Sequence, residues 1–163
     1  MRKTIAWTTH LPVLIRLMNK TSGPVLELGS GIFSTPYLHW ACFADKRELV
    51  SYDNSPEFIG LMQQYANDYH KVIAVDDYAD ADIEKVWSLA FVDHDPAHRR
   101  GIDTMRLLDY ATFVVVHDSD PRTQSTYGYD EAFKHAKYRW DFTDVKPNTT
   151  VLSNFLDLKE FHL

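Results

Sequence analysis

The chain is short of cysteine, of basic runs and of long apolar stretches, and each shortage excludes a class of protein. Cys42 is the single cysteine, so an internal disulfide framework is excluded. No stretch approaches membrane-spanning length and no signal-peptide core opens the chain, so we expect a cytoplasmic protein with no membrane partner. Basic residues number 17 against 23 acidic ones, giving a net charge of -6. Because phosphate backbones attract basic surfaces, we expect no nucleic-acid partner.

Glycine is also scarce, and two of the six glycines stand at informative positions. Gly29 and Gly31 close the segment Val-Leu-Glu-Leu-Gly-Ser-Gly, in which a short apolar run ends in a glycine turn and a helical pattern follows. This layout predicts a strand, a glycine loop and a helix N-terminus, with a backbone that can approach a ligand closely. Glu27 places a carboxylate in the otherwise apolar strand, which is unfavourable unless hydrogen bonds satisfy it. We therefore interpret the loop as part of a cofactor site.

Strand and helix patterns alternate along the chain, which predicts a mostly parallel sheet. We expect a single domain over 1–163, with a core over 25–155 and an N-terminal helix over 9–20. Ser55 followed by Pro56 predicts a capped helix start. The predicted strands cover 25–29, 48–53, 71–75, 89–92 and 112–116, the other predicted helices include 34–45, 98–109 and 129–137, and the strands 138–145 and 149–155 form a final hairpin.

Several cofactor classes bind at glycine loops, and the local residues distinguish them. A dinucleotide fingerprint requires Gly-x-Gly-x-x-Gly, and Ser34 stands in place of the third glycine. A P-loop is excluded because no Gly-Lys-Ser/Thr follows. The Glu-x-Gly-x-Gly spacing and the later Asp53 resemble the first two motifs of class I S-adenosylmethionine-dependent methyltransferases. The resemblance implies a three-layer, Rossmann-like α/β fold whose seven-stranded, mostly parallel sheet has an antiparallel last strand.

The same resemblance implies S-adenosylmethionine as the cofactor and a set of residues around it. This cofactor has a cationic amino-acid end and no phosphate, so acidic surroundings suit it. Asp53 ends the second predicted strand, where a carboxylate can bind both ribose hydroxyls. Asp76 and Asp77 end the third predicted strand, where they can meet the adenine amino group. The implied cofactor-binding residues are Glu27, Gly29, Ser30, Gly31, Asp53, Asn54, Asp76, Asp77 and Asp93.

A second acidic pair follows the fourth and fifth predicted strands. Asp93 and Asp118 end neighbouring strands of the implied sheet, and two converging carboxylates can bind Mg²⁺. The arrangement resembles catechol- and caffeoyl-type O-methyltransferases, which carry an Asp after the fourth strand and an Asp-Asn or Asp-Asp pair after the fifth. Ser119 departs from that pair, and Pro96 stands where the catechol-type lysine base is expected. We therefore treat Mg²⁺ as an optional second cofactor beside S-adenosylmethionine.

Two histidines beside these acids are candidates for a general base. The Val-Asp-His-Asp stretch resembles sugar and macrolide O-methyltransferases, and imidazole has a suitable pKa. We interpret Asp93, His94 and His117 as the catalytic residues and prefer His94 as the base, because it follows Asp93 in a turn. A zinc cluster of His94, His98 and His117 is disfavoured, since no HExxH or Cys/His spacing supports it. The remaining histidines are interpreted as surface or packing residues: His10, His39, His70, His135 and His162.

These interpretations lead to one main function and two alternatives. The main function is methyl transfer from S-adenosylmethionine to a small-molecule acceptor, with a hydroxyl oxygen as the preferred nucleophile. A polar segment, 119–130, follows the fifth predicted strand at the ligand end of the sheet, where it can contact the substrate. One alternative is a protein that binds or consumes S-adenosylmethionine without methyl transfer. The other is a nucleotide- or dinucleotide-dependent Rossmann enzyme.

Overall fold

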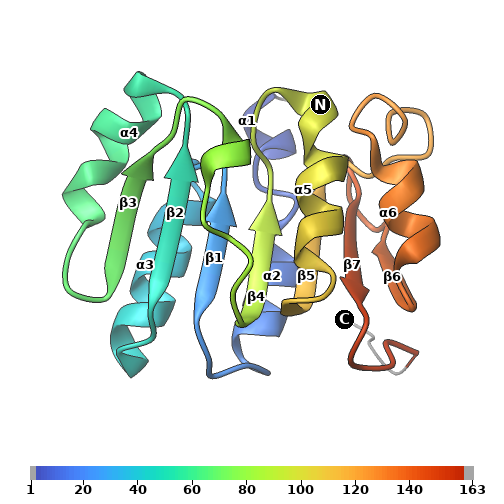
Figure 1. Cartoon of the computed structure of the whole chain (residues 1–163), viewed down its shortest axis with the longest axis horizontal. Helices are drawn as coiled ribbons and strands as arrows, with labels where there is room; N and C mark the ends of the chain where they lie inside the picture. The colour runs from blue at the N-terminus through green and yellow to red at the C-terminus, as the bar shows by residue number, and fades with distance from the viewer. Residues whose placement is uncertain (1–2, 160–163) are drawn as a thin grey trace.

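A seven-stranded sheet forms the centre of the molecule (Figure 1). The computed structural model describes residues 3–159, with side chains from Ile5 onward. The strand order is β3-β2-β1-β4-β5-β7-β6, and the first five strands in the chain are parallel. The strands are β1 (Val25–Leu28), β2 (Leu49–Asp53), β3 (His70–Ala74), β4 (Trp87–Val92), β5 (Ala111–His117), β6 (Tyr138–Phe142) and β7 (Thr149–Ser153). The last strand, β7, pairs antiparallel with β5, so the predicted sheet is confirmed.

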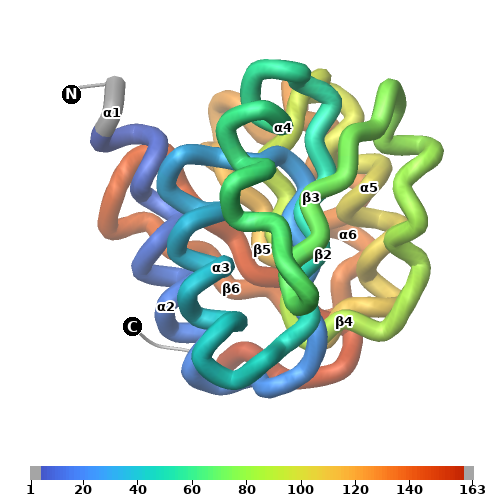
Figure 2. The backbone as a smooth tube through the Cα atoms, turned by 90° about the vertical axis from the view of Figure 1, so that its left-hand side faces the viewer, coloured from blue at the N-terminus to red at the C-terminus, as the bar shows by residue number. Residues whose placement is uncertain are grey.

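Helices cover both faces of the sheet (Figure 2). Behind the sheet in Figure 1 lie α2 (Leu11–Met18) and α3 (Ser34–Asp45), and in front of it lie α5 (Arg100–Leu107) and α6 (Tyr129–His135). The remaining helices are α1 (Lys3–Ala6) and α4 (Pro56–Met62), with short 3-10 turns η1 (Gln63–Tyr65), η2 (Tyr78–Asp80) and η3 (Ala97–Arg99). Ser55 caps α4 as predicted, since its hydroxyl accepts a hydrogen bond from the Phe58 amide at 3.4 Å.

Most predicted elements are confirmed with small shifts of their ends. The N-terminal helix is shorter than predicted, because α2 begins at Leu11 and Pro12 takes one of its first positions. The predicted helix over 98–109 begins with the 3-10 turn η3, and α5 itself starts at Arg100. β5 runs one residue further than predicted, so His117 still belongs to the strand.

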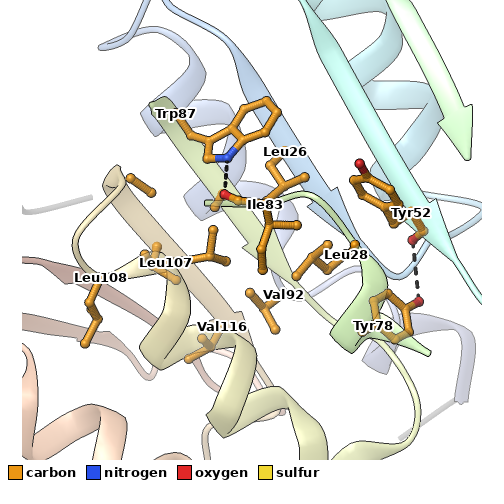
Figure 3. Packing of buried hydrophobic residues seen from close by; sticks show 14 of the residues in the cluster. Leu26, Leu28, Tyr52, Tyr78, Ile83, Trp87, Val92, Leu107, Leu108 and Val116 are labelled. Atoms are coloured by element: carbon orange, nitrogen blue, oxygen red, sulfur yellow. Dashed lines mark hydrogen bonds between the residues drawn. The ribbon is translucent and has the colours of Figure 1, made fainter. Parts of the chain in front are cut away.

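Side-chain alternation along the strands divides the core into two clusters. Leu26 and Leu28 face the side of α5 and α6, whereas Val25 faces the side of α2 and α3. Figure 3 shows the first cluster, in which the Trp87 indole donates a hydrogen bond of 2.7 Å to the Ile83 carbonyl. That bond satisfies the buried indole N–H of Trp87. Its acceptor, Ile83, belongs to the described segment between β3 and β4, which contains the turn η2 and no α-helix.

The fold brings the predicted site residues to one edge of the sheet. The parallel strands β1, β2, β4 and β5 all end at the upper edge in Figure 1, so the segments that follow them lie at the same edge. This is the edge at which open α/β sheets bind ligands. Among residues 3–159, no helix combines the length and apolar character needed to cross a membrane.

Candidate functional site

The glycine loop after β1 packs tightly against the end of β4. Gly29 has a φ of +93°, a conformation that favours glycine. A Cβ at this position would lie 2.6 Å from the carbonyl oxygen of Asp93, so any side chain would displace one of the two segments. The Gly29 amide donates to the Tyr52 carbonyl at 2.9 Å, which ties the loop to β2 as well. Position 29 therefore requires glycine, because the ends of β1, β2 and β4 approach one another closely here.

Asp53 lies beside this loop, as the sequence predicts. Its carboxylate accepts hydrogen bonds from the Ser30 amide at 2.6 Å and from the Ser55 amide at 2.7 Å. Burial raises the pKa of Asp53 more than these backbone amides lower it. The neighbouring Asn54 donates from Nδ2 to the Asp95 carbonyl at 2.9 Å. Asp53 thus stabilises the loop. Each of its carboxylate oxygens has a second lone pair, which can still accept a hydrogen bond from a hydroxyl group.

Glu27 lies behind the glycine loop. Its side chain is fully buried, and its Oε2 accepts hydrogen bonds from Thr35 Oγ1 at 2.9 Å and Ser51 Oγ at 2.6 Å. Thr35 Oγ1 in turn accepts from the Gly31 amide at 2.9 Å. Burial is the main reason that the pKa of Glu27 rises to about 7, against the opposing effect of the hydroxyl donors. The expected hydrogen bonds are present, but they place Glu27 in a supporting position beneath the loop.

The acidic pair after β3 is exposed at the same edge. Asp77 caps the turn η2, because its Oδ1 accepts from the Ala79 amide at 2.8 Å. The same oxygen lies 3.4 Å from Arg99 Nη1. Asp76 is exposed beside it. Their predicted contact with adenine stays a prediction.

His94 does not lie where a general base has to lie, and the preference for it is corrected. Its side chain has no exposed surface and its ring stacks on Tyr78, with ring centroids 4.0 Å apart. Its Nε2 lies 3.2 Å from Asp103 Oδ2, inside a charged cluster with Arg99 and Arg106. The turn after Asp93 therefore directs the imidazole into the packing between η2 and α5.

Asp93 and Asp118 do converge, but a cation of the protein itself lies between them. Arg100 Nη1 is 2.8 Å from Asp93 Oδ1 and 3.1 Å from Asp118 Oδ2. Its Nε donates to the His94 carbonyl at 2.6 Å, and the side chain is buried. Ser119, which replaces the third ligand of the resembled enzymes, is buried, and its Oγ lies 2.8 Å from Thr150 Oγ1. The site between the two carboxylates therefore does not fit a Mg²⁺, because the Arg100 guanidinium already lies there and balances the charge of both carboxylates.

His117 is the histidine that contacts Asp93. Their strands are in register at Val92 and Val116, so the next residues lie side by side, and His117 Nδ1 is 3.2 Å from Asp93 Oδ2. Burial lowers the pKa of His117, but the Asp93 carboxylate outweighs it and the net shift is upward. Burial acts to raise the pKa of Asp93, but the opposing effect of His117 and Arg100 is larger. The net result is a pKa of about 2. The structure thus forms an oriented imidazole–carboxylate pair, with 23% of the Asp93 side chain exposed.

The histidines interpreted as surface or packing residues differ in their positions. His135 is exposed, and His162 lies outside the described residues. His39 and His70 are buried and joined by their Nδ1 atoms at 3.2 Å. His10 is buried against Phe91 and His117, so it belongs to the site although its sequence context gives no signal of this.

Two cavities, of about 220 and 630 Å³, are lined mainly by residues near the amino ends of the strands and include none of the predicted site residues.

Comparisons with known proteins agree on the fold. No protein-family model matches the chain, and neither does any curated protein sequence. Among solved structures, the methyltransferase PaMTH1 of Podospora anserina with bound SAH superposes with a TM-score of 0.66 at 13% identity, over 92% of this chain and 78% of that one. An O-methyltransferase of Bacillus cereus in complex with SAH gives a TM-score of 0.61 at 15% identity, covering 93% and 80%. The N-methyltransferase NodS of Bradyrhizobium japonicum, with S-adenosyl-L-homocysteine, gives 0.60 at 13%, covering 86% and 82%.

These likenesses extend over nearly the whole chain, and they cover enzymes described with oxygen and with nitrogen acceptors. At 13–15% identity they establish the arrangement of helices and strands and not the chemistry. The strand order and the antiparallel β7 fit the same arrangement. The protein has the fold of the class I S-adenosylmethionine-dependent methyltransferases.

Proposed function

We propose that the protein binds S-adenosylmethionine at the glycine loop and transfers its methyl group to a small-molecule acceptor. One observation carries the proposal: a glycine loop with a left-handed Gly29 lies at the carboxyl end of β1, hydrogen-bonded to the carboxylate that ends β2. This loop stands in a seven-stranded sheet, and the chain superposes with a TM-score of 0.66 on a structure described with bound SAH. In such a sheet, this edge binds the ligand.

The residues present fit the proposed cofactor. The loop Gly29–Gly31 begins directly after β1, and the absence of a Cβ at Gly29 lets it pack against the backbone of Asp93. The buried Oγ of Ser30 has no hydrogen-bond partner among the described residues, so a polar ligand group at the loop can satisfy it. Asp53 is placed to accept from ribose hydroxyls, with Asn54, Asp76 and Asp77 along the same edge. When bound, the cofactor supplies a methyl group on a cationic sulfonium, which an acidic edge attracts.

The acceptor is proposed to lie beside Asp93 and His117. These two residues end β4 and β5, next to the glycine loop, and Asp93 retains an exposed part of its side chain. Holding a nucleophile in line with the methyl group lowers the barrier chiefly through orientation. The polar pair suits a hydroxyl acceptor, which it can orient by hydrogen bonds. Arg100, between Asp93 and Asp118, fixes both carboxylates in place.

Calorimetric titration of the purified protein with S-adenosylmethionine, SAH and NAD tests the cofactor assignment. We expect SAH to bind and NAD not to bind, and Asp53→Ala to weaken SAH binding by about 1.5–3 kcal/mol, the range of charge-assisted hydrogen bonds. Asp45→Ala is the matched control, because Asp45 is exposed at the opposite end of α3. Equal SAH affinity in Asp53→Ala and the parent would remove the proposed site, and tighter binding of NAD would favour the Rossmann-enzyme alternative.

A second experiment tests the reaction. The parent protein with methyl-labelled S-adenosylmethionine is incubated with a panel of phenols, sugars and amines, and transfer of label is measured. Labelled product with a hydroxyl acceptor supports the proposal. Cofactor binding without transfer to any acceptor would favour the alternative of a protein that binds or consumes S-adenosylmethionine.

A further inference from the structure

The imidazole of His10 is buried and makes no hydrogen bond to the residues that the structure describes. Only 2% of its surface is exposed, and neither ring nitrogen has a hydrogen-bond partner among the described residues. The ring packs against Phe91, with centroids 4.7 Å apart, and meets His117 edge to face at 4.9 Å. Buried imidazole nitrogens are normally paired, because leaving them unpaired forfeits their hydration without compensation. The position therefore indicates a missing partner.

A carboxylate and a second imidazole lie next to this unpaired ring. One potential ligand atom from each of His10, Asp93 and His117 lies within 4.8 Å of the other two. The three residues come from distant parts of the chain: the segment before α2, the end of β4 and the end of β5. A tetrahedral ion with bonds of about 2.1 Å holds its ligand atoms about 3.4 Å apart. Binding such an ion therefore requires the ligand atoms of the three residues to move closer together.

The contacts of Thr9 bear on the protonation of His117. Thr9 Oγ1 lies 2.8 Å from the Pro147 carbonyl, 3.2 Å from the Ala6 carbonyl and 2.9 Å from His117 Nε2. Where the single hydroxyl hydrogen is donated to a carbonyl, His117 Nε2 is the donor to Thr9. The lone pair of a neutral His117 would consequently face Asp93 Oδ2 from Nδ1, at 3.2 Å. Two acceptors at that distance repel unless a proton or a metal ion lies between them.

We propose that His10, Asp93 and His117 bind a divalent transition-metal ion of the zinc class. Two imidazoles and one carboxylate form a donor set suited to zinc, and three protein ligands leave a fourth position open. The Asp93 side chain keeps 23% of its surface exposed. Arg100 holds Asp93 Oδ1 and Thr9 holds His117 Nε2, so both ligands are oriented by neighbouring groups. The site differs from the Mg²⁺ site predicted between Asp93 and Asp118, where Arg100 lies.

The fourth position would be open to water or to an anionic or hydroxyl group of a small molecule. The metal would stand at the acceptor side of the proposed methyl-transfer site, which it shares through Asp93. The metal proposal nevertheless does not depend on the proposed function, because metal binding is measured without cofactor or substrate.

Cobalt binding to the full-length, tag-free protein tests the proposal. The protein is treated with a chelator, then titrated with Co²⁺ while visible absorption is recorded, and metal content is measured by mass spectrometry. We expect one Co²⁺ per chain, with the absorption of a tetrahedral or five-coordinate ion, and its displacement by Zn²⁺. Absence of stoichiometric binding, or only the weak absorption of a hydrated octahedral ion, would overturn the proposal.

Substitutions assign the ligands. His10→Phe keeps a ring against Phe91 but removes both nitrogens, and we expect it to weaken Co²⁺ binding by more than about 100-fold while the protein stays folded. His39→Gln is the matched control, because His39 is a buried histidine of α3 whose Nδ1 contacts His70, and its substitution should leave Co²⁺ affinity unchanged. Thr9→Val, which removes an orienting contact, should weaken binding by about 10–100-fold. A folded His10→Phe variant with the parent affinity for Co²⁺ would refute the assignment.

Measuring SAH affinity of the same proteins separates the two proposals. Loss of Co²⁺ binding with SAH affinity retained would support the metal site and leave the cofactor site intact. Stoichiometric Co²⁺ binding in a protein that does not bind SAH would support the metal site and contradict the proposed function.

Discussion

Replacing Glu27 by glutamine tests the role of the buried carboxyl beneath the glycine loop. Glu27 is fully buried, and its Oε2 receives hydrogen bonds from Thr35 and Ser51. A glutamine carbonyl can accept the same two bonds, and its amide takes the position of Oε1, which has no hydrogen-bond partner among the described residues. The substitution therefore keeps the shape and the acceptor while removing the possibility of ionisation.

The expected magnitude follows from the pKa. Burial raises the pKa of Glu27 from 4.5 to about 7, so the folded protein retains a proton that the unfolded chain releases above pH 4.5. The stabilisation is fully present below pH 4.5 and is lost as the pH rises through about 7. A shift of this size corresponds to about 3 kcal/mol. Glutamine does not titrate, so the Glu27→Gln variant does not lose this stability.

Urea denaturation followed by tryptophan fluorescence measures the effect at pH 5 and pH 8. We expect the free energy of unfolding of the variant, relative to the parent, to improve by about 3 kcal/mol between these two pH values. Burial lowers the pKa of His70 to about 4, but His70 titrates in both proteins and cancels in the difference. Glu48→Gln is the control, because Glu48 is exposed at the start of β2 and should show no pH-dependent difference. A difference between Glu27→Gln and the parent that stays constant from pH 5 to pH 8 would refute the reasoning.

Four further substitutions test other contacts of the site. Gly29→Ala should destabilise the fold by about 1–3 kcal/mol in urea denaturation, because its φ is +93° and its Cβ would meet the Asp93 carbonyl; a stability equal to the parent would contradict the tight approach. Arg100→Met should lower the free energy of unfolding by about 3–5 kcal/mol, since two facing carboxylates lose their cation, and an unchanged urea midpoint would show that the ion pairs are unimportant. His117→Gln should reduce methyl-transfer turnover by about 10²-fold or more, whereas His94→Gln should mainly lower stability; the reverse pattern in steady-state assays would restore His94 as the acceptor-side residue.

The glycine loop could be predicted from a local pattern, because Gly29 directly follows an apolar run. The convergence of the strand ends was predicted from the strand order that the family resemblance implies, and the sheet has that order. The pairing of Asp93 with His117 required the register, since Val92 lies opposite Val116 and the residues after them become neighbours. A strand one residue longer than predicted therefore changed which side chain meets Asp93.

Arg100 was missed although the helix pattern contains a signal for it. Arg100, Thr104 and Leu107 share one buried face of α5, at spacings of four and three residues. An arginine on such a face is buried, and a buried guanidinium requires carboxylate partners. That reasoning places Arg100 near an acidic pair and argues against a Mg²⁺ there. His10 offers no comparable signal, because its contact with His117 joins positions 107 residues apart through the packing of the segment before α2.

The two carboxylates at this edge are compensated in different ways, and the difference separates two parts of the site. Asp53 is held by backbone amides, and burial leaves its pKa raised, so its negative charge is the less completely balanced of the two. Asp93 contacts Arg100 and His117, and these charges lower its pKa to about 2 despite burial. A ligand that brings hydroxyl donors and positive charge gains most beside Asp53. Beside Asp93, Arg100 and His117 already supply part of the balancing positive charge, so a ligand there needs to bring less of it. The two carboxylates thus differ in how much of the balancing charge comes from the protein and how much is left for a ligand.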